Sequence, residues 1–259
     1  MESKDIMSSL AKGLATIETF TADSPRQSIA QVAAASGLDR ATARRCLLTL
    51  AHLGFADYDG KFFTLTPRIM RLGTACLATM PLPQIVQPLL DRLSDELGQS
   101  TSVSILDGDE IIYIARAAQR KVMSISLTPG SRLPAYCTSM GRVMLSALPH
   151  DQINSMVLAD SAGLTDSTGL AARTPNTITD AAALLTELAR VRDQGYAVID
   201  QEVELGLISI AVPIYDARGR VVAALNIGLS SHHADAGQLA ALYLDKLTAI
   251  QSELRKMLL

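Results

Sequence analysis

The stretch of residues 28–66 constrains the fold more than any other part of this chain. Two short helical patterns meet at a turn, with Ser28 and Asp39 placed to cap them and Gly37 between them. A hairpin with an Asp59-Gly60 corner follows, since this dipeptide is typical of tight β-turns. The order of helix, turn, helix and hairpin predicts a winged helix-turn-helix, whose second helix can enter the major groove of DNA.

The helix capped by Asp39 has an apolar face and a basic face. Because apolar residues recur at helical spacing, the arginines between them point outward, where donors can read bases and hold phosphates. The residues expected to contact DNA are Arg40, Thr42, Arg44, Arg45 and Lys61. Thr42 and Arg45 are candidates for base edges and Lys61 for the backbone, but which arginine reads a base stays open. A solvated arginine face on an ordinary helical hairpin is the alternative.

The length and the cysteines limit the class of protein. A chain of 259 residues suggests about two domains at roughly 150 residues each. Three cysteines at wide spacings argue against a disulfide framework and favour a reducing cytoplasm. The N-terminus lacks the pattern of a signal peptide, and no apolar run reaches the roughly 20 residues that span a bilayer. We therefore expect a cytoplasmic protein with no membrane partner.

The residues beyond the hairpin divide into a linker and a second domain. A helix is predicted from Pro67 to about residue 80, where Pro81 and Pro83 stop it. Strands are predicted at 101–106, 111–117, 122–127, 196–201, 207–214 and 220–229, and helices at 83–97, 138–148, 150–158, 180–195 and 235–257. Strands interleaved with helices predict an α+β fold with a mostly antiparallel sheet. We expect a winged helix-turn-helix domain at residues 1–66, a linker helix at 67–82 and the second domain at 83–259.

Two segments carry a resemblance to a known family. The first joins SLAKGLATIETF to the helix-turn-helix and wing just described. The second, GYAVIDQEVELGLISIAVPIYD at 195–216, places Glu202 seven positions before Ser209. In both segments, and over nearly its whole length, the chain resembles the IclR family of bacterial transcriptional regulators. Within that family, DGKFFTLTPRIMRLG and MSISLTPGSRLPAYCTSMGRVMLSAL are most similar to the PcaR/PcaU/PobR group.

The resemblance implies a function. It implies a ligand-responsive, sequence-specific regulator of aromatic-acid catabolism through the β-ketoadipate pathway, with a GAF-like domain at 83–259 for effector binding and oligomerisation. The implied partners are double-stranded operator DNA, further copies of the chain in a homodimer or tetramer, and a small carboxylic acid. Protocatechuate, 4-hydroxybenzoate and β-ketoadipate are examples of that acid. The effector, the operator and the direction of control stay open.

The resemblance also places an effector site. By position, the site residues are Val122, Ile125, Ser139, Met140, Ser209, Asn226 and Gly228. The residues themselves agree in part, because Ser209 and Asn226 are polar residues within apolar strands and need partners that a ligand could supply. Ser139 lies at a predicted helix N-terminus, which favours an anion, although it could instead be only the helix cap. Arg116, Arg132 and Arg142 are candidate partners for a carboxylate.

Enzyme chemistry is not indicated. Thr138-Ser139-Met140-Gly141 does not match a nucleophile elbow, and Cys137 is better explained as a buried structural residue. The adjacent His232-His233 pair lacks the spacing of a metal site, and no phosphate-binding or dinucleotide motif is found. We expect no catalytic residues, metal or cofactor. The alternative is a binding or catalytic GAF-like domain whose winged helix serves only protein association.

Overall fold

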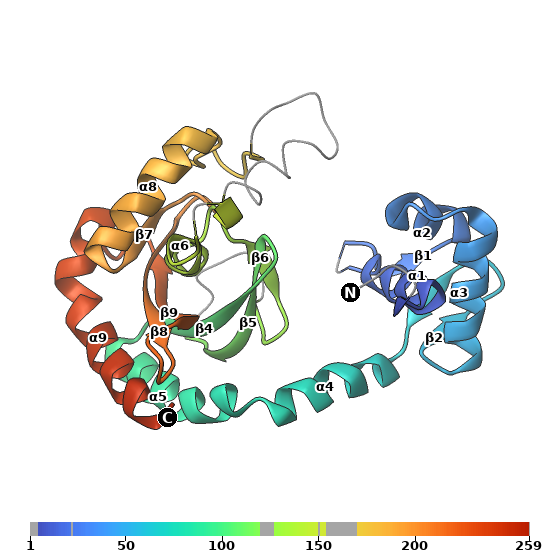
Figure 1. The fold of residues 1–259 in the computed structure, drawn as a ribbon, viewed down its shortest axis with the longest axis horizontal. Coiled ribbons are helices and arrows are strands. Elements are labelled where there is room, and N and C mark those ends of the chain that lie inside the picture. Colours follow the sequence, from blue (N-terminus) through green and yellow to red (C-terminus); the bar gives the residue numbers. More distant parts are fainter. Residues whose placement is uncertain (1–4, 22, 120–126, 150, 154–169, 259) are drawn as a thin grey trace. The chain divides into compact units, whose positions relative to one another are not determined.

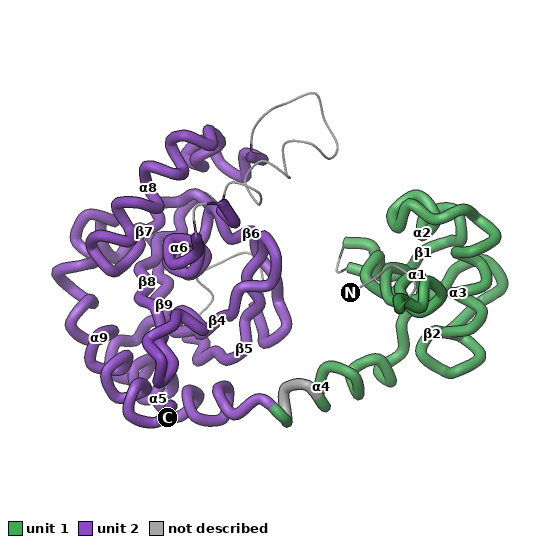
Figure 2. The backbone as a smooth tube through the Cα atoms, in the orientation of Figure 1, with its two compact units in different colours: residues 1–79 green, residues 80–259 purple. Residues whose placement is uncertain are grey.

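The chain folds into two compact units, residues 1–79 and 80–259 (Figure 2). The computed structural model describes residues 5–21, 23–119, 127–149, 151–153 and 170–258. The predicted strand at 122–127 and the predicted helix at 150–158 fall mainly outside the described residues. The linker helix α4 (Met70–Thr79) belongs to the first unit, and α5 (Pro81–Leu97) opens the second.

The first unit is a helix-turn-helix with a wing. Its elements are α1 (Ser8–Glu18), β1 (Arg26–Gln27), α2 (Ile29–Ser36), α3 (Arg40–His52), β2 (Ala56–Tyr58), β3 (Phe63–Leu65) and the 3-10 turn η2 (Pro67–Ile69). The Ser28 side chain caps α2 in a capping box with Gln31, and Gly37 ends that helix at a φ of 67°. Asp39 accepts a hydrogen bond from the Thr42 backbone at 2.9 Å and starts α3. These local signals confirm the predicted helix-turn-helix.

The described part of the second unit is built on a six-stranded sheet. Its strands are β4 (Ser100–Asp107), β5 (Glu110–Ala117), β6 (Arg132–Pro134), β7 (Ala197–Asp200), β8 (Leu207–Tyr215) and β9 (Val221–Ser230). Their order is β6-β5-β4-β9-β8-β7, and every neighbouring pair is antiparallel. The α+β prediction is therefore confirmed. Strand β6 was not predicted, because it is only three residues long and ends in proline.

Helices cover both faces of this curled sheet (Figure 1). On one face lie α6 (Ser139–Ser146) and α8 (Ala181–Gln194), packed on Ala211 and Ala224. On the other lie α5 and α9 (Leu239–Met257), with the turn η4 (Ala236–Gln238) before α9; they pack on Ile208 and Ile210. Alternation along β8 thus sends successive residues to two separate cores. Among the described helices, none combines the length and apolar character that a membrane span requires.

Candidate functional site

The first turns of α3 carry the predicted DNA-contacting arginines. Arg40, Arg44 and Arg45 are all exposed on this helix, so the structure brings them together on its solvent side. Thr42 differs, because it is only 8% exposed. Its backbone N–H serves the Asp39 cap, and its hydroxyl has little surface with which to reach a base edge. The contact predicted for Thr42 therefore finds no support in its position.

The wing tip adds a second basic point. Exposed Lys61 places its Nζ 5.2 Å from the ring centre of Phe62, and Arg26 places its guanidinium carbon 4.2 Å from the same ring. Arg26 also pairs with Asp59 at 2.5 Å. The backbone N–H of Phe62 and the guanidinium of Arg26 hold the pKa of Asp59 well below its usual range. Arg26 was missed from the sequence because its strand β1 pairs with the distant β3.

Five of the predicted effector residues line one cavity between α6 and the sheet. They are Ser139, Met140, Ser209, Asn226 and Gly228, and Val122 and Ile125 lie outside the described residues. The free volume of this cavity is about 30 Å³, so any ligand larger than a few water molecules requires its walls to move apart. Thr138, rather than Ser139, caps α6 by accepting from the Gly141 N–H. The Ser139 hydroxyl therefore takes no part in the cap and instead forms a hydrogen bond of 2.8 Å with the Ser209 hydroxyl.

Polar side chains form a row across the floor of the cavity. Ser102 on β4 stands opposite Arg116 on β5 and opposite Asn226 on β9. In the next row of the same face, Gly228 stands between Ser100 and Ser209. With strands about 4.8 Å apart, the row places Arg116 and Asn226 roughly 10 Å apart at their backbones. The two residues thus mark opposite ends of one cavity.

A bulge in β5 brings Arg116 into this row. Ser104 pairs with Tyr113 but Val103 pairs with Ala115, so Ile114 is an extra residue in the strand. An extra residue reverses the alternation of side chains beyond it. Tyr113 and Arg116, three positions apart, therefore face the same cavity instead of opposite faces.

Two buried polar atoms in the cavity have no partner among the described residues. They are Nε of Arg116 and Oδ1 of Asn226, a donor and an acceptor. Burial lowers the pKa of Arg116, and no described carboxylate pairs with its charge; its Nη1 donates to Ser102 at 2.8 Å. Burial raises the pKa of Tyr113 to about 12, so its phenol stays neutral at physiological pH. The cavity can therefore take an anion at one end and a hydrogen-bond donor at the other.

The other two candidate arginines are already paired. Arg132 lies at the exposed sheet edge and pairs with Asp107 and Glu110 at 2.8 and 2.6 Å. Arg142 is buried and pairs with Glu202 at 2.5 Å. Neither lines the cavity that holds Asn226.

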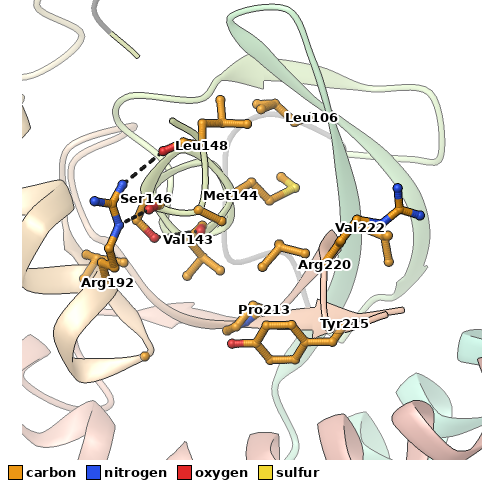
Figure 3. A pocket seen from close by; sticks show the side chains of 15 residues that line it. Leu106, Val143, Met144, Ser146, Leu148, Arg192, Pro213, Tyr215, Arg220 and Val222 are labelled. Carbon is orange, nitrogen blue, oxygen red and sulfur yellow. Dashed lines mark hydrogen bonds between the residues drawn. The ribbon is translucent and has the colours of Figure 1, made fainter. Parts of the chain in front are cut away.

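A larger hollow lies at the C-terminal end of α6 (Figure 3). Leu106, Met144 and Val222 give it a largely aliphatic lining. Its arginines have partners, since Arg192 donates to the carbonyl groups of Ser146 and Leu148, and Arg220 pairs with Asp216. This hollow offers less to an acid than the cavity at the other end of the helix.

Cys137 lies fully buried in the core beneath α6. Burial raises the pKa of its thiol to about 11, so the reactive thiolate is scarce at neutral pH. These properties suit the structural cysteine that the sequence indicated.

Two family models match the chain. The model described as the IclR helix-turn-helix domain matches residues 9–60, and the model described as the bacterial transcriptional regulator IclR C-terminal domain matches residues 74–253. The second match alone covers more than half of the 259 residues.

Known proteins of similar sequence are regulators. The Pca regulon regulatory protein of Pseudomonas putida is 43% identical to this chain, and the match covers 96% of this chain and 84% of the Pseudomonas protein. The p-hydroxybenzoate hydroxylase transcriptional activator of Acinetobacter baylyi is 35% identical, and the match covers 99% of this chain and 94% of the activator. Among solved structures, the inducer-binding domain of an Acinetobacter PobR double mutant in complex with 3-hydroxybenzoic acid is 32% identical and superposes with a TM-score of 0.59. This match covers 67% of the present chain and 97% of the PobR domain. This chain is not an enzyme but a DNA-binding transcriptional regulator, and it belongs to the IclR family, in the PcaR/PobR group.

Proposed function

We propose that this regulator is controlled by a hydroxylated aromatic acid bound between α6 and the sheet. The observation that carries the proposal is a pair of buried atoms, Nε of Arg116 and Oδ1 of Asn226, for which no residue described in the structure supplies a partner. A buried donor and a buried acceptor left unpaired both cost free energy, which one ligand can recover by bonding to each. The names of the relatives, which include p-hydroxybenzoate and 3-hydroxybenzoic acid, support an acid of this class.

The proposed pose follows from the two ends of the cavity. The carboxylate of the acid accepts from Arg116 and from the neutral Tyr113 phenol, and its ring packs among Met140 and Leu207. The ring hydroxyl donates to Asn226. The hydroxyl pair of Ser139 and Ser209 lies beside this path and can adjust as donor or acceptor.

This pose predicts that the chain distinguishes hydroxybenzoates from benzoate. We expect 4-hydroxybenzoate or 3-hydroxybenzoate to bind about tenfold or more tightly than benzoate, because benzoate leaves Asn226 without a donor. Isothermal titration calorimetry with the three acids measures the ratio. In an Asn226→Leu variant the preference should disappear, since the acceptor is gone. Equal affinity of the parent for all three acids would contradict the placement of Asn226.

On DNA, we propose that α3 and the wing contact the operator through Arg40, Arg44, Arg45 and Lys61. The exposure of all four side chains supports this set. Thr42 is left out of the set because it is buried. Arg26 joins the set as a phosphate contact, because it flanks the same wing-tip ring as Lys61. The operator lies in the bacterial cytoplasm, where we place the protein.

We further propose that the chain acts as a homodimer joined through its first unit. An apolar groove lies between α1, α3 and the residues that begin α4, and it is lined by Leu10, Leu14, Leu53 and Leu72. Leu10 and Leu14 are 60% and 49% exposed, which favours a partner surface over solvent. A second copy would present the same groove about a twofold axis and set two α3 helices on a palindromic operator.

Replacing Leu10 and Leu14 together with glutamine should therefore weaken self-association. We expect a smaller molar mass in sedimentation and an operator affinity about tenfold or more below that of the parent, with unchanged helicity, because both side chains are exposed in one chain. Glutamine adds no charge, so electrostatic repulsion from DNA does not contribute. Leu205→Gln, at an equally exposed leucine of the second unit, is the control. A double variant with the mass of the parent would refute this interface.

A further inference from the structure

Arg142 is the fully buried arginine among the described residues of the second unit. Arg142 on α6 is 1% exposed, and its Nε donates to the Tyr136 carbonyl at 2.9 Å. One Nη lies 2.5 Å from the Glu202 carboxylate, and the other lies 3.8 Å from that of Glu187 on α8. A buried ion pair of this kind adds little net stability compared with apolar residues of the same size, so its position invites another explanation.

Glu202 belongs to a tightly held loop, residues 201–206, between β7 and β8. Gln201 adopts a φ of 59°, which is strained for a residue with a side chain, and its Oε1 accepts from the Gly206 N–H. Thr177 donates to the Glu202 carbonyl, and the Glu202 carboxylate accepts from the Ile178 N–H. The carboxylate of Glu202 therefore joins this loop to Ile178 and to α6 at once, and its carbonyl adds a bond to Thr177.

Both partners of the ion pair stand directly behind walls of the effector cavity. Ser139 and Met140 line it from α6, within one turn before Arg142. Val203 and Leu207 line it from the loop side, next to Glu202 and at the start of β8. Gly141, next to Arg142, packs closely on the backbone of Ala135, since an added Cβ would lie 2.1 Å from the Ala135 carbonyl oxygen.

We propose that the Arg142–Glu202 pair is a clamp that positions these two walls and thereby sets the affinity of the cavity for its acid. The inference rests on the function proposed above, because it assigns a role to residues that do not touch the acid. Arg142 and Glu202 are positioning residues: the pair fixes the distance between the start of α6 and the loop 201–206. On the cavity side, the bond between Ser139 and Ser209 joins the start of α6 to β8, the strand that follows this loop.

Glu202→Gln tests the clamp, since it keeps the shape of the side chain and removes its charge. We expect two effects in the full-length protein. Backbone amides of residues 139–141 and 203–207 should exchange with deuterium about tenfold faster, and the Kd for 4-hydroxybenzoate should rise about tenfold. Operator affinity without the acid should equal that of the parent.

Glu187→Gln is the matched control. It removes the other carboxylate near Arg142, but α8 does not contribute Glu187 to the cavity lining. It should leave the exchange of residues 203–207 and the Kd unchanged, even where it lowers the melting temperature. If Glu202→Gln does not fold, Arg142→Met with Glu202→Gln leaves no buried cation without a partner, and it should show the same two effects.

The outcomes separate the clamp from the proposed function. A folded Glu202→Gln with the exchange and Kd of the parent overturns the clamp, as does a Glu187→Gln variant with the same losses. A parent that binds none of the hydroxybenzoates overturns the proposed effector instead, and the exchange rates alone then decide whether the pair holds the two walls together.

Discussion

Replacing Arg44 and Arg45 together with alanine is expected to lower operator affinity by about 100-fold or more. Both side chains are exposed on the first turns of α3, where base and phosphate contacts are made in helix-turn-helix proteins. Each well-placed arginine contributes about 1–3 kcal/mol, and a dimer presents each residue twice. Fluorescence anisotropy with labelled promoter DNA, at one fixed salt concentration, measures the loss.

The control removes two positive charges elsewhere. Arg255→Ala with Lys256→Ala changes an exposed helix end of the second unit and should keep the operator affinity of the parent. Because Arg45 borders the apolar groove of the first unit, sedimentation must show that the double alanine variant keeps the molar mass of the parent. A folded variant of parental mass that still binds the operator as the parent does would remove α3 from the interface.

Single variants then separate the roles of the two arginines. A residue that contacts phosphate should weaken all DNA sequences alike and reduce the slope of log affinity against log salt by about 1 for each copy, or about 2 for the dimer. A residue that reads a base should weaken the operator and leave binding to unrelated DNA unchanged. The sequence left this assignment open, since both arginines are adjacent on one helix.

The helix-turn-helix could be predicted because its signals are local. A capping serine at position 28, a left-handed glycine at 37 and a capping aspartate at 39 act within a few residues of themselves, and each lies where expected. Strand β1 has no such signal, because its two residues are held only by β3, over thirty positions later. Arg26, which that pairing brings to the wing tip, was therefore missed.

The effector cavity could be predicted only in part. Asn226 and Ser209 stood out as polar residues in apolar strands, and the structure places both in one cavity. The choice among Arg116, Arg132 and Arg142 depended on tertiary structure. The bulge at Ile114 turns Arg116 into the cavity, whereas Arg132 and Arg142 form ion pairs with carboxylates that are distant in the sequence. No spacing along the chain reveals a bulge or a partner sixty residues away.

Replacing Arg116 with methionine is expected to raise the Kd for the hydroxybenzoate effector by about 100-fold or more. The guanidinium is half-buried and lacks a described carboxylate partner, so a bound carboxylate would form its ion pair. Removing one member of such a buried pair costs about 2–5 kcal/mol. Calorimetry with 4-hydroxybenzoate measures the change, and operator affinity without the acid should equal that of the parent.

Thermal denaturation without any ligand distinguishes a ligand-binding arginine from a structural one. A charge that waits for a ligand is unpaired in the free protein, so its removal should leave the melting temperature unchanged or raise it. Arg132→Met is the matched control: it breaks two exposed ion pairs at the sheet edge and should leave the Kd for the acid unchanged. If Arg116→Met lowers the melting temperature but binds the acid as the parent does, the guanidinium stabilises the sheet and the carboxylate of the effector binds elsewhere.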